Sequence, residues 1–458
     1  MASIRENAPR YVAVGTELDD APDYASADAT RVAQLRPPKE DKALIPVPVG
    51  MDWALFSTVL ALMSIGVIMA YSASVYLGLQ AGNDQHFLQK HLIHAGLALV
   101  TILIGAHIPY QWWRRAAYPL LFLAVGLLAA TLQYGVVVNG SRRWIRLPGF
   151  MFQTAEFAKV AFVMYLAHSL TKKIEAARVH KFSVGFVPHA LAWVAVFALC
   201  MKQPDLGTGI VLGVLLFAMT FIAGTNMAYV VFFGGLAGTG LITFILQNPM
   251  RRARFFAFLY PEEHRLTTAF QLYNGKLAVA TGGLFGNGLG LSKQKLGFVP
   301  ECHTDFILSI IGEELGLIGV ALVALAFIFF IRRGLRIALH ARDEFGRLLA
   351  SGITVLFGTQ AAVNFGVVMG ILPTKGLTLP FVSHGGSSML ILGMALGILI
   401  NVGRGGDPDA VPPSLPSWPS WLRLPKRAAA NSPRNARSGA HRGNSAGLRG
   451  VDNSGGAA

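Results

Sequence analysis

One carboxylate lies where an apolar segment begins. Residues 300–317 read PECHTDFILSIIGEELGL, and Asp305 stands at the edge of a long apolar run, 304–331. Ionisable side chains within membrane-spanning segments are costly and by default indicate function. A carboxylate in this place can act as a general base, or it can cap the helix and favour its dipole. Thr304 is an equally good cap, so capping does not require Asp305.

Three further polar residues follow Asp305 on the same predicted helix. Ser309 lies one turn below it, and Glu313 and Glu314 lie about two turns below. At about 100° per residue, Glu313 is roughly 80° from Asp305 around the helix, whereas Glu314 is roughly opposite. The spacing predicts that Glu313, with Ser309, belongs to the cavity of Asp305, and that Glu314 faces another helix.

Basic residues occur in two segments that a positive-inside topology places outside the membrane. One reads VVNGSRRWIRLPGFMFQ, with Arg142 and Arg143 beside Trp144, and the longer one, 247–303, opens NPMRRARFFAFLYPEE. Arginine presents a planar fork of donors that suits phosphate oxygens, and aromatic side chains seat a loop at headgroup level. We interpret both segments as binding a lipid phosphate or pyrophosphate. The alternative is that they only anchor loops to phospholipid headgroups.

Three more segments contain charged residues or the first residues of a predicted helix. In QTAEFAKVAF, Glu156 and Lys159 are three residues apart on one helix face, where they either position an anionic lipid head or form a structural ion pair. In KQPDLGTG, Asp205 follows a helix-breaking proline, and a turn cap is its simpler role. In LPTKGLTLPFVSHGGSS, Lys375 adds positive charge and Ser383 precedes a helix start whose N–H groups attract anions. This last segment predicts a second wall of a phosphate-binding cavity.

The elements that must position these residues are membrane helices. The chain has 458 residues, 53% of them hydrophobic and 14% charged, against roughly 25% charged in soluble domains. Apolar runs near the roughly 20 residues needed to cross a bilayer recur along it. About ten are predicted, at 53–78, 87–106, 116–135, 152–170, 188–201, 207–223, 228–246, 304–331, 348–372 and 381–402. The predicted fold class is an all-α polytopic membrane protein with a large extracytoplasmic loop between its seventh and eighth helices.

Charge distribution predicts the topology and the division of the chain. The formal net charge of +15 reflects basic residues in tails and short loops, which favours positive-inside orientation over nucleic-acid binding. Both termini are therefore expected in the cytoplasm. We expect a disordered extension at 1–52, a membrane domain at 53–403 and a disordered basic tail at 404–458. The two cysteines, Cys200 and Cys302, are expected to be free thiols.

Five motifs, taken in order, resemble the SEDS family (shape, elongation, division, sporulation) of bacterial cell-wall polymerases. They are GSRRWI, EFAK, QPDLGT, GGLFGNGLGLSKQKLGFVPECHTDFILSIIGEELG and LPTKGLTLPFVSHGGSS. The resemblance covers roughly residues 50–403, and LPTKGLTLPF with the long extensions favours the division branch over the elongation branch. One departure is His384, where the family usually has tyrosine.

The resemblance implies a peptidoglycan glycosyltransferase in the bacterial inner membrane, at the division septum. It implies that the enzyme polymerises lipid II, the undecaprenyl-pyrophosphate-linked disaccharide pentapeptide, with Asp305 as the catalytic residue. It also implies a class B penicillin-binding protein and other division proteins as partners. No organic cofactor is expected, a divalent cation such as Mg or Mn is compatible, and the identity of any metal is left open.

The residues also suggest a mechanism and its competitors. A sugar alkoxide needs an acid to leave, whereas lipid pyrophosphate needs only positive charge, so one carboxylate and a basic cavity suffice. We expect Asp305 to deprotonate the acceptor 4-hydroxyl, with pyrophosphates held by Arg142, Arg143, Lys159 and Lys375. A transporter that flips lipid II is the alternative, and a non-catalytic division scaffold is a third.

Overall fold

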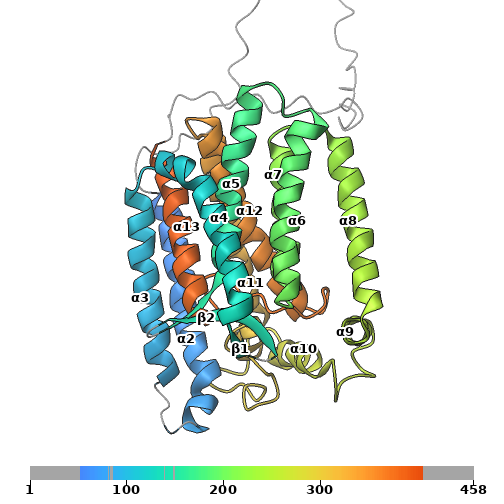
Figure 1. Cartoon of the computed structure of the whole chain (residues 1–458). Coiled ribbons are helices and arrows are strands. Elements are labelled where there is room, and N and C mark those ends of the chain that lie inside the picture. Colours follow the sequence, from blue (N-terminus) through green and yellow to red (C-terminus); the bar gives the residue numbers. More distant parts are fainter. Residues whose placement is uncertain (1–51, 81, 83–85, 139, 148–149, 406–458) are drawn as a thin grey trace, which may run out of the picture. The chain divides into compact units, whose positions relative to one another are not determined.

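The fold is a bundle of long helices with a small sheet at one end (Figure 1). The computed structural model describes residues 52–80, 82, 86–138, 140–147 and 150–405. The ten predicted helices correspond to α2 (Trp53–Gln80), α3 (His86–His107), α4 (Tyr110–Tyr134), α5 (Thr154–Glu175), α6 (Val187–Lys202), α7 (Leu206–Ile222), α8 (Met227–Gln247), α11 (Ile307–Leu339), α12 (Glu344–Val368) and α13 (Gly386–Arg404). The sequence predicted disordered tails at 1–52 and 404–458. Of these residues, the structure describes only 52, 404 and 405.

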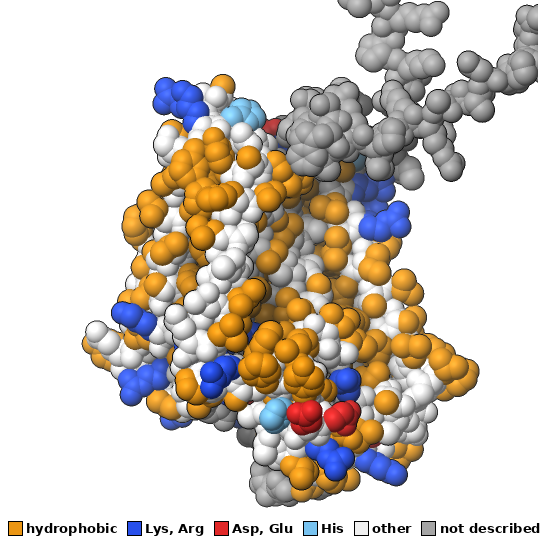
Figure 2. All heavy atoms as spheres, turned by 90° about the vertical axis from the view of Figure 1, so that its right-hand side faces the viewer, with side chains coloured by type: hydrophobic (Ala, Val, Ile, Leu, Met, Phe, Trp, Pro, Cys, Tyr) orange, Lys and Arg blue, Asp and Glu red, His pale blue; other side chains and the backbone are white. Residues whose placement is uncertain are grey.

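The all-α membrane class is confirmed, whereas the count of ten crossings stays a prediction. Within the described ranges, eight helical stretches are long and apolar enough to cross a bilayer. Helices α5 and α7 are the two that do not qualify, and α7 is a shorter apolar helix of 17 residues. Figure 2 shows hydrophobic side chains across the middle of one face, with lysine and arginine near its two ends. This banding is what a membrane-spanning bundle requires.

Helix α5 lies at the centre of the packing. Almost every side chain from Thr154 to Thr171 is buried, including the charged pair near its start. Elsewhere in the bundle, helices α3 and α13 pack closely against each other, because glycines of each face the backbone of the other. A Cβ atom added at Gly397 would lie 2.2 Å from the carbonyl oxygen of Ile102. Small residues permit such close approach of helices in a membrane, where burial from water does not drive association.

The segment between α4 and α5, expected as a loop, is an antiparallel sheet. Its strands are β1 (Val136–Val138), β2 (Ser141–Leu147) and β3 (Phe150–Gln153), in the order β1-β2-β3. Trp144 of β2 pairs with Gln153 of β3, which sets the register next to the start of α5. Successive side chains of a strand point to opposite faces of the sheet. Neighbouring residues of the GSRRWI motif therefore cannot all face one site.

The long segment 247–303 contains two helices and a glycine-rich turn. Helix α9 (Pro249–Leu259) begins at Asn248, whose side chain accepts hydrogen bonds from the backbone of Met250 and Arg251. Helix α10 (Phe270–Gly282) packs against α11. Both helices lie at the same end of the bundle as the small sheet (Figure 1).

Helix α11 is interrupted at Gly316, which adopts φ 68° and ψ −168°. The interruption frees two carbonyl groups and two N–H groups, and residues 283–288 bind all four. Glu313 O and Glu314 O accept from the N–H groups of Asn287 (2.9 Å) and Gly288 (3.1 Å). The N–H groups of Leu317 and Ile318 donate to Gly283 O (2.9 Å) and Leu284 O (3.2 Å). The first part of α11 is thus attached to the segment that follows α10.

Two buried carboxylates strengthen this attachment. Glu313 accepts hydrogen bonds from the backbone N–H of Lys293 (2.9 Å) and from the Ser292 hydroxyl. Glu314 forms a buried ion pair with Lys295 (2.9 Å) and accepts from the Ser72 hydroxyl of α2 (2.7 Å). Both charges are satisfied, which burial demands. Glu314 does face another helix, but the partners of Glu313 are not those that the helical spacing predicted.

We predict that Gly316→Ala lowers the free energy of unfolding by about 2 kcal/mol or more, because a side chain in the left-handed region costs about 1–2 kcal/mol before any clash. The added Cβ would also lie 2.4 Å from Gly286 N and Leu284 O. Thermal unfolding in detergent measures the effect. The matched control is Gly238→Ala in α8, where a Cβ meets nothing within 4 Å. Equal melting temperatures for the two variants would contradict this account of the break.

Candidate functional site

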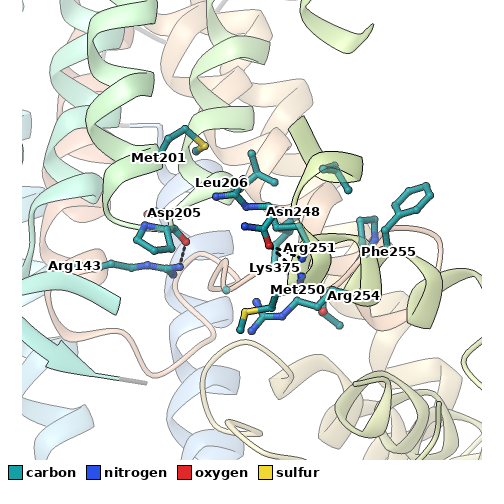
Figure 3. A pocket seen from close by; sticks show the side chains of 16 residues that line it. Arg143, Met201, Asp205, Leu206, Asn248, Met250, Arg251, Arg254, Phe255 and Lys375 are labelled. Carbon is teal, nitrogen blue, oxygen red and sulfur yellow. Dashed lines mark hydrogen bonds between the residues drawn. The ribbon is translucent and has the colours of Figure 1, made fainter. Parts of the chain in front are cut away.

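A cavity of about 310 Å³ lies at the end of the bundle that carries the sheet. Its walls come from β2, the α6–α7 turn, the junction of α8 and α9, and residues 373–376. Figure 3 shows Arg143 and Asp205 on one side and the basic side chains of α9 with Lys375 on the other. The charged or polar side chains that line it are Arg143, Asp205, Asn248, Arg251, Arg254, Thr374 and Lys375. Four cations against one carboxylate make the cavity a site for an anion.

Asp305 lies beside this cavity, next to the backbone of Gly376. A Cβ atom built on Gly376 would lie 3.1 Å from Asp305 Oδ2 and 3.7 Å from Arg143 Nη1. The missing side chain at this position lets the carboxylate and the guanidinium approach the same stretch of backbone. Asp305 is half-buried, so it keeps some access to solvent or substrate.

The turn that carries Asp305 is held by Asn364 of α12. The Asn364 side-chain amide donates to Asp305 O (2.8 Å) and to Leu377 O (2.9 Å). This one amide joins the start of α11 to the segment that bears Lys375 and Gly376. The position of the carboxylate relative to the cavity therefore depends on a buried hydrogen-bonding residue, and leaving its partners unpaired would be costly.

The α6–α7 turn positions the other side of the cavity. Asp205 caps α7, since its carboxylate accepts from the backbone N–H (3.2 Å) and the hydroxyl (2.8 Å) of Thr208. Arg143 donates to the carbonyl oxygens of Gln203 (3.3 Å) and Pro204. The capping role expected for Asp205 is thus present, and the same residue lies in the cavity wall.

The surroundings of Asp305 and Lys375 shift the pKa values of both side chains. Burial, reinforced by the negative charge of Glu301, raises the pKa of Asp305 to about 7, although Arg143 opposes the shift. Burial, reinforced by Arg254, lowers the pKa of Lys375 to about 8. A carboxylate with a pKa near neutrality is suited to take up a proton at physiological pH.

The cavity brings together only some of the residues singled out in the sequence. Arg143, Asp205 and Lys375 line it, and Asp305 adjoins it. Arg142 is exposed and donates to Leu132 O at 3.3 Å, because alternation along β2 turns it away from Arg143. Trp144 is half-buried within the sheet and does not line the cavity.

Five other expected residues also lie away from the cavity lining. Lys159 is completely buried and forms an ion pair with Glu156 at 2.7 Å, which matches the structural alternative. Ser383 accepts from Leu379 N at 2.8 Å and so stabilises its own turn. Ser309 is fully buried, and Glu313 binds residues 292–294.

The segment NPMRRARFFAFLYPEE was expected to bind phosphate, but the sequence did not indicate which of its arginines would face the site. Arg251 and Arg254 lie three apart on one face of α9, and the Arg251 guanidinium stacks on the Phe244 ring at 3.9 Å. Arg252 is on a different face and does not line the cavity. Helical spacing within MRRAR could have separated these arginines, had a helix been assigned there. Nothing in the sequence pattern indicated Asn364 or Gly376.

The described residues offer no ready set of ligands for a divalent cation. In the part of the chain that the structure describes, no group of three or more His, Cys, Asp or Glu side chains is arranged to hold a metal ion. A hard cation such as Mg²⁺ takes oxygen ligands and often keeps several waters and substrate phosphates. The described residues therefore do not form a complete protein site for such a cation.

The fold and the cavity define a multi-pass membrane protein with a basic anion site beside a carboxylate. Comparison with known proteins is consistent with that class and makes it specific. The chain belongs to the FtsW/RodA/SpoVE family of cell cycle proteins, which matches residues 52–406.

Individual relatives extend over most of the membrane domain. The chain is 44% identical over 357 residues to the probable peptidoglycan glycosyltransferase FtsW of Trichlorobacter lovleyi, covering 77% of this chain and 93% of that protein. It is 40% identical over 356 residues to stage V sporulation protein E of Bacillus subtilis, covering 77% and 97%.

Two solved structures share the fold. One is a chain of a peptidoglycan synthase complex that coordinates polymerization and crosslinking, with a TM-score of 0.64, 27% identity, and coverage of 78% of this chain and 98% of that one. The other is the rod shape determining protein RodA of Thermus thermophilus, with a TM-score of 0.58, 28% identity and the same coverages.

Proposed function

We propose that this chain is a peptidoglycan glycosyltransferase that polymerises lipid II into β-1,4 glycan strands during cell division and releases undecaprenyl pyrophosphate. The observation that carries the proposal is the juxtaposition of Asp305 and Arg143 across Gly376, at the edge of a cavity rich in cations. The printed names of the FtsW relatives support the reaction and the division role.

Asp305 is the general base of the proposed reaction. It takes the proton from the 4-hydroxyl of the acceptor GlcNAc, whose oxygen forms a bond to C1 of the donor MurNAc with inversion. The bond from C1 to the pyrophosphate oxygen breaks, and the electron pair leaves with the lipid pyrophosphate. A pKa of about 7 leaves much of Asp305 ionised near neutral pH and makes proton transfer to it favourable.

The leaving group is stabilised by the cations of the cavity. Arg143, Arg251, Arg254 and Lys375 surround the space where a pyrophosphate would lie. Positive charge aimed at developing negative charge is the largest catalytic contribution in many enzymes. Of the four cations expected from the sequence, Arg143 and Lys375 belong to this set. Arg142 faces elsewhere, and Lys159 is buried in its ion pair with Glu156. A divalent cation, Mg²⁺ or Mn²⁺, bound to the pyrophosphate itself would add positive charge.

The proposal includes location and partners. We place the chain in the bacterial inner membrane at the division septum, with both termini in the cytoplasm and the cavity facing the periplasm. The basic cytoplasmic segments, such as Arg332, Arg333 and Arg336, support this orientation. A class B penicillin-binding protein is the proposed partner, supported by the likeness to a chain of a peptidoglycan synthase complex. Other division proteins are proposed to act on the pair.

The two alternative functions, a lipid II flippase and a non-catalytic scaffold, make different demands on the charged residues. A lipid II flippase needs polar residues along a path through the bilayer. The buried charges Glu156 and Lys159 neutralise each other and do not line the cavity, which favours a site at one end of the bundle. A scaffold without catalysis would not require Asp305 at all.

We predict that Asp305→Asn reduces polymerisation of lipid II by about 100-fold or more, because an amide cannot accept the proton. The measurement is the yield of glycan strands from purified protein and lipid II. It is run in liposomes with a fluorescent lipid II, so that crossing of the bilayer and polymer formation are scored separately.

Glu262→Gln is the matched control, since it removes an exposed carboxylate from the same long segment. This variant should polymerise normally. Full polymerisation by Asp305→Asn would remove Asp305 from the mechanism. Lipid II crossing without any polymer, in the unmodified protein with its partner present, would favour the flippase instead.

We predict a bell-shaped dependence of the polymerisation rate on pH. The rate rises as Asp305 loses its proton through a pKa of about 7 and falls as Lys375 loses its charge through a pKa of about 8. Arginine stays protonated throughout this range, so Lys375→Arg should remove the alkaline fall and keep the acid rise. Initial rates across the range test both limbs. An alkaline limb that persists in Lys375→Arg would assign it to another group.

A further inference from the structure

The glycine-rich turn at residues 283–291 exposes large apolar side chains. The exposed fractions are 61% for Leu284, 80% for Phe285, 58% for Leu289 and 64% for Leu291. The proposed glycosyl transfer uses none of these side chains. Exposed apolar residues that gather on one segment indicate a surface for another protein or for lipid. The position of this turn along α11 favours lipid.

Two polar contacts join α2 to α11 at two levels of the bundle. At one level, Asp52, which precedes α2, pairs with Arg333 of α11 at 2.8 Å. At the other level, the Ser72 hydroxyl of α2 donates to Glu314 of α11 at 2.7 Å, and Glu314 pairs with Lys295. At about 1.5 Å per helical residue, the two levels are about 30 Å apart along α2 and about 29 Å along α11. This distance equals the thickness of a bilayer's hydrocarbon core, about 30 Å, so we take the two levels as its boundaries.

The turn is attached to α11 on the hydrocarbon side of the Glu314 level. The backbone N–H of Ile318 donates to Leu284 O at 3.2 Å. Leu317 and Ile318 follow Glu314 by three and four residues, which places them about 5 Å inside the boundary. Both side chains are exposed, as a helix face in contact with lipid requires. Leu284 therefore lies at the depth of the acyl chains, with Phe285 next to it in the chain.

The backbone of the turn meets the requirement for entering hydrocarbon. Non-helical backbone is tolerated at membrane depth only where protein satisfies its polar groups. The N–H groups of Asn287 and Gly288 donate to the carbonyl oxygens freed at the break of α11. Gly286 permits this approach, because its φ is 82° and a Cβ atom there would lie 2.1 Å from Glu314 O. The turn thus keeps its backbone against α11 and exposes its apolar side chains.

We propose that residues 284–291 form a re-entrant turn whose apolar side chains insert among the acyl chains of the leaflet at the sheet end of the bundle. The surface is continuous with the lipid-facing side of α11 at Leu317 and Ile318. Lys293 follows the turn, and its backbone N–H binds the Glu313 carboxylate near the boundary. Its exposed side chain is placed to reach lipid phosphates. The proposal rests on the membrane-spanning bundle and does not depend on the proposed glycosyl transfer.

Insertion would fix the segment that carries Asp305 relative to the bilayer. After the turn, residues 292–295 bind the carboxylates of Glu313 and Glu314, and the chain then continues to Asp305. Asp305 precedes the first residue of α11 by two residues, which places it about 10 Å or more on the water side of the Glu314 level. The turn and the carboxylate therefore lie on opposite sides of the same membrane boundary.

The test uses nitroxide spin labels on introduced cysteines in the full-length chain, reconstituted alone in nanodiscs of phosphatidylethanolamine and phosphatidylglycerol. The label at Phe285→Cys is compared with two references. Ile242→Cys replaces an exposed residue of the membrane helix α8, and Glu262→Cys replaces an exposed carboxylate between α9 and α10. The unmodified chain is the labelling blank, because Cys200 and Cys302 are buried. Relaxation of each label is measured with oxygen, which concentrates in hydrocarbon, and with a water-soluble nickel chelate.

We expect the ratio of oxygen to nickel relaxation at position 285 to match that at 242 and to exceed that at 262 several-fold. A ratio at 285 equal to that at 262 would overturn the proposal, because the turn would then face water. A label at 285 that neither reagent reaches would also overturn it, because protein would then cover the turn.

A second measurement uses stability in the same nanodiscs. Phe285 is 80% exposed and has few protein contacts to lose, so Phe285→Asp should matter only if its surroundings are hydrocarbon. We expect this variant to lower the melting temperature by several degrees, and Leu266→Asp, at a residue 82% exposed in the same long segment, to leave it unchanged. An unchanged melting temperature in Phe285→Asp would overturn the proposal. The spin-label measurement covers the case in which the added charge prevents folding.

Discussion

The interruption of α11 at Gly316 is the constraint on which the position of the candidate site depends. Backbone groups freed inside a membrane must be satisfied by protein, because lipid offers no hydrogen bonds. Residues 283–288 bind the four groups freed around the break, and the buried carboxylates of Glu313 and Glu314 hold residues 292–295. The first part of α11 is thereby joined to the segment after α10, and Asp305 lies just before it.

A second constraint is that the positively charged side chains of the cavity come from three separate segments and repel one another. Arg143 comes from β2, Arg251 and Arg254 from α9, and Lys375 from the turn after α12. Their mutual repulsion contributes to the lowered pKa of Lys375, and a bound pyrophosphate would relieve it. Asp205 balances part of this charge while it caps α7. Binding of an anionic ligand therefore stabilises this arrangement of cations.

The sequence was sufficient for what depends on hydrophobic runs and charge. It predicted the long helices, and it singled out Asp305, Arg143, Asp205 and Lys375, which lie in or beside the cavity. It did not predict the direction of a side chain where that direction depends on whether the segment is a strand or a helix.

A strand in place of a loop turns Arg142 away from Arg143, and a helix in place of a loop turns Arg254 toward the cavity. For Glu313 the angle around an ideal helix does not apply, because Asp305 lies in the turn before α11 begins at Ile307. Partners distant in sequence determine where this buried carboxylate goes. Neither Asn364 nor Gly376 carries a signal in a single sequence, because their roles exist only once α11, α12 and the turn after α12 meet.

The central claim is that glycosyl transfer takes place between Asp305 and the basic cavity. The most direct measurement is a structure of the Asp305→Asn variant with lipid II bound, in a lipid nanodisc with its partner. The account predicts a pyrophosphate between Arg143, Arg254 and Lys375, and a sugar hydroxyl next to the side chain at position 305. Lipid II bound with its pyrophosphate elsewhere on the bundle, away from these residues, would contradict it.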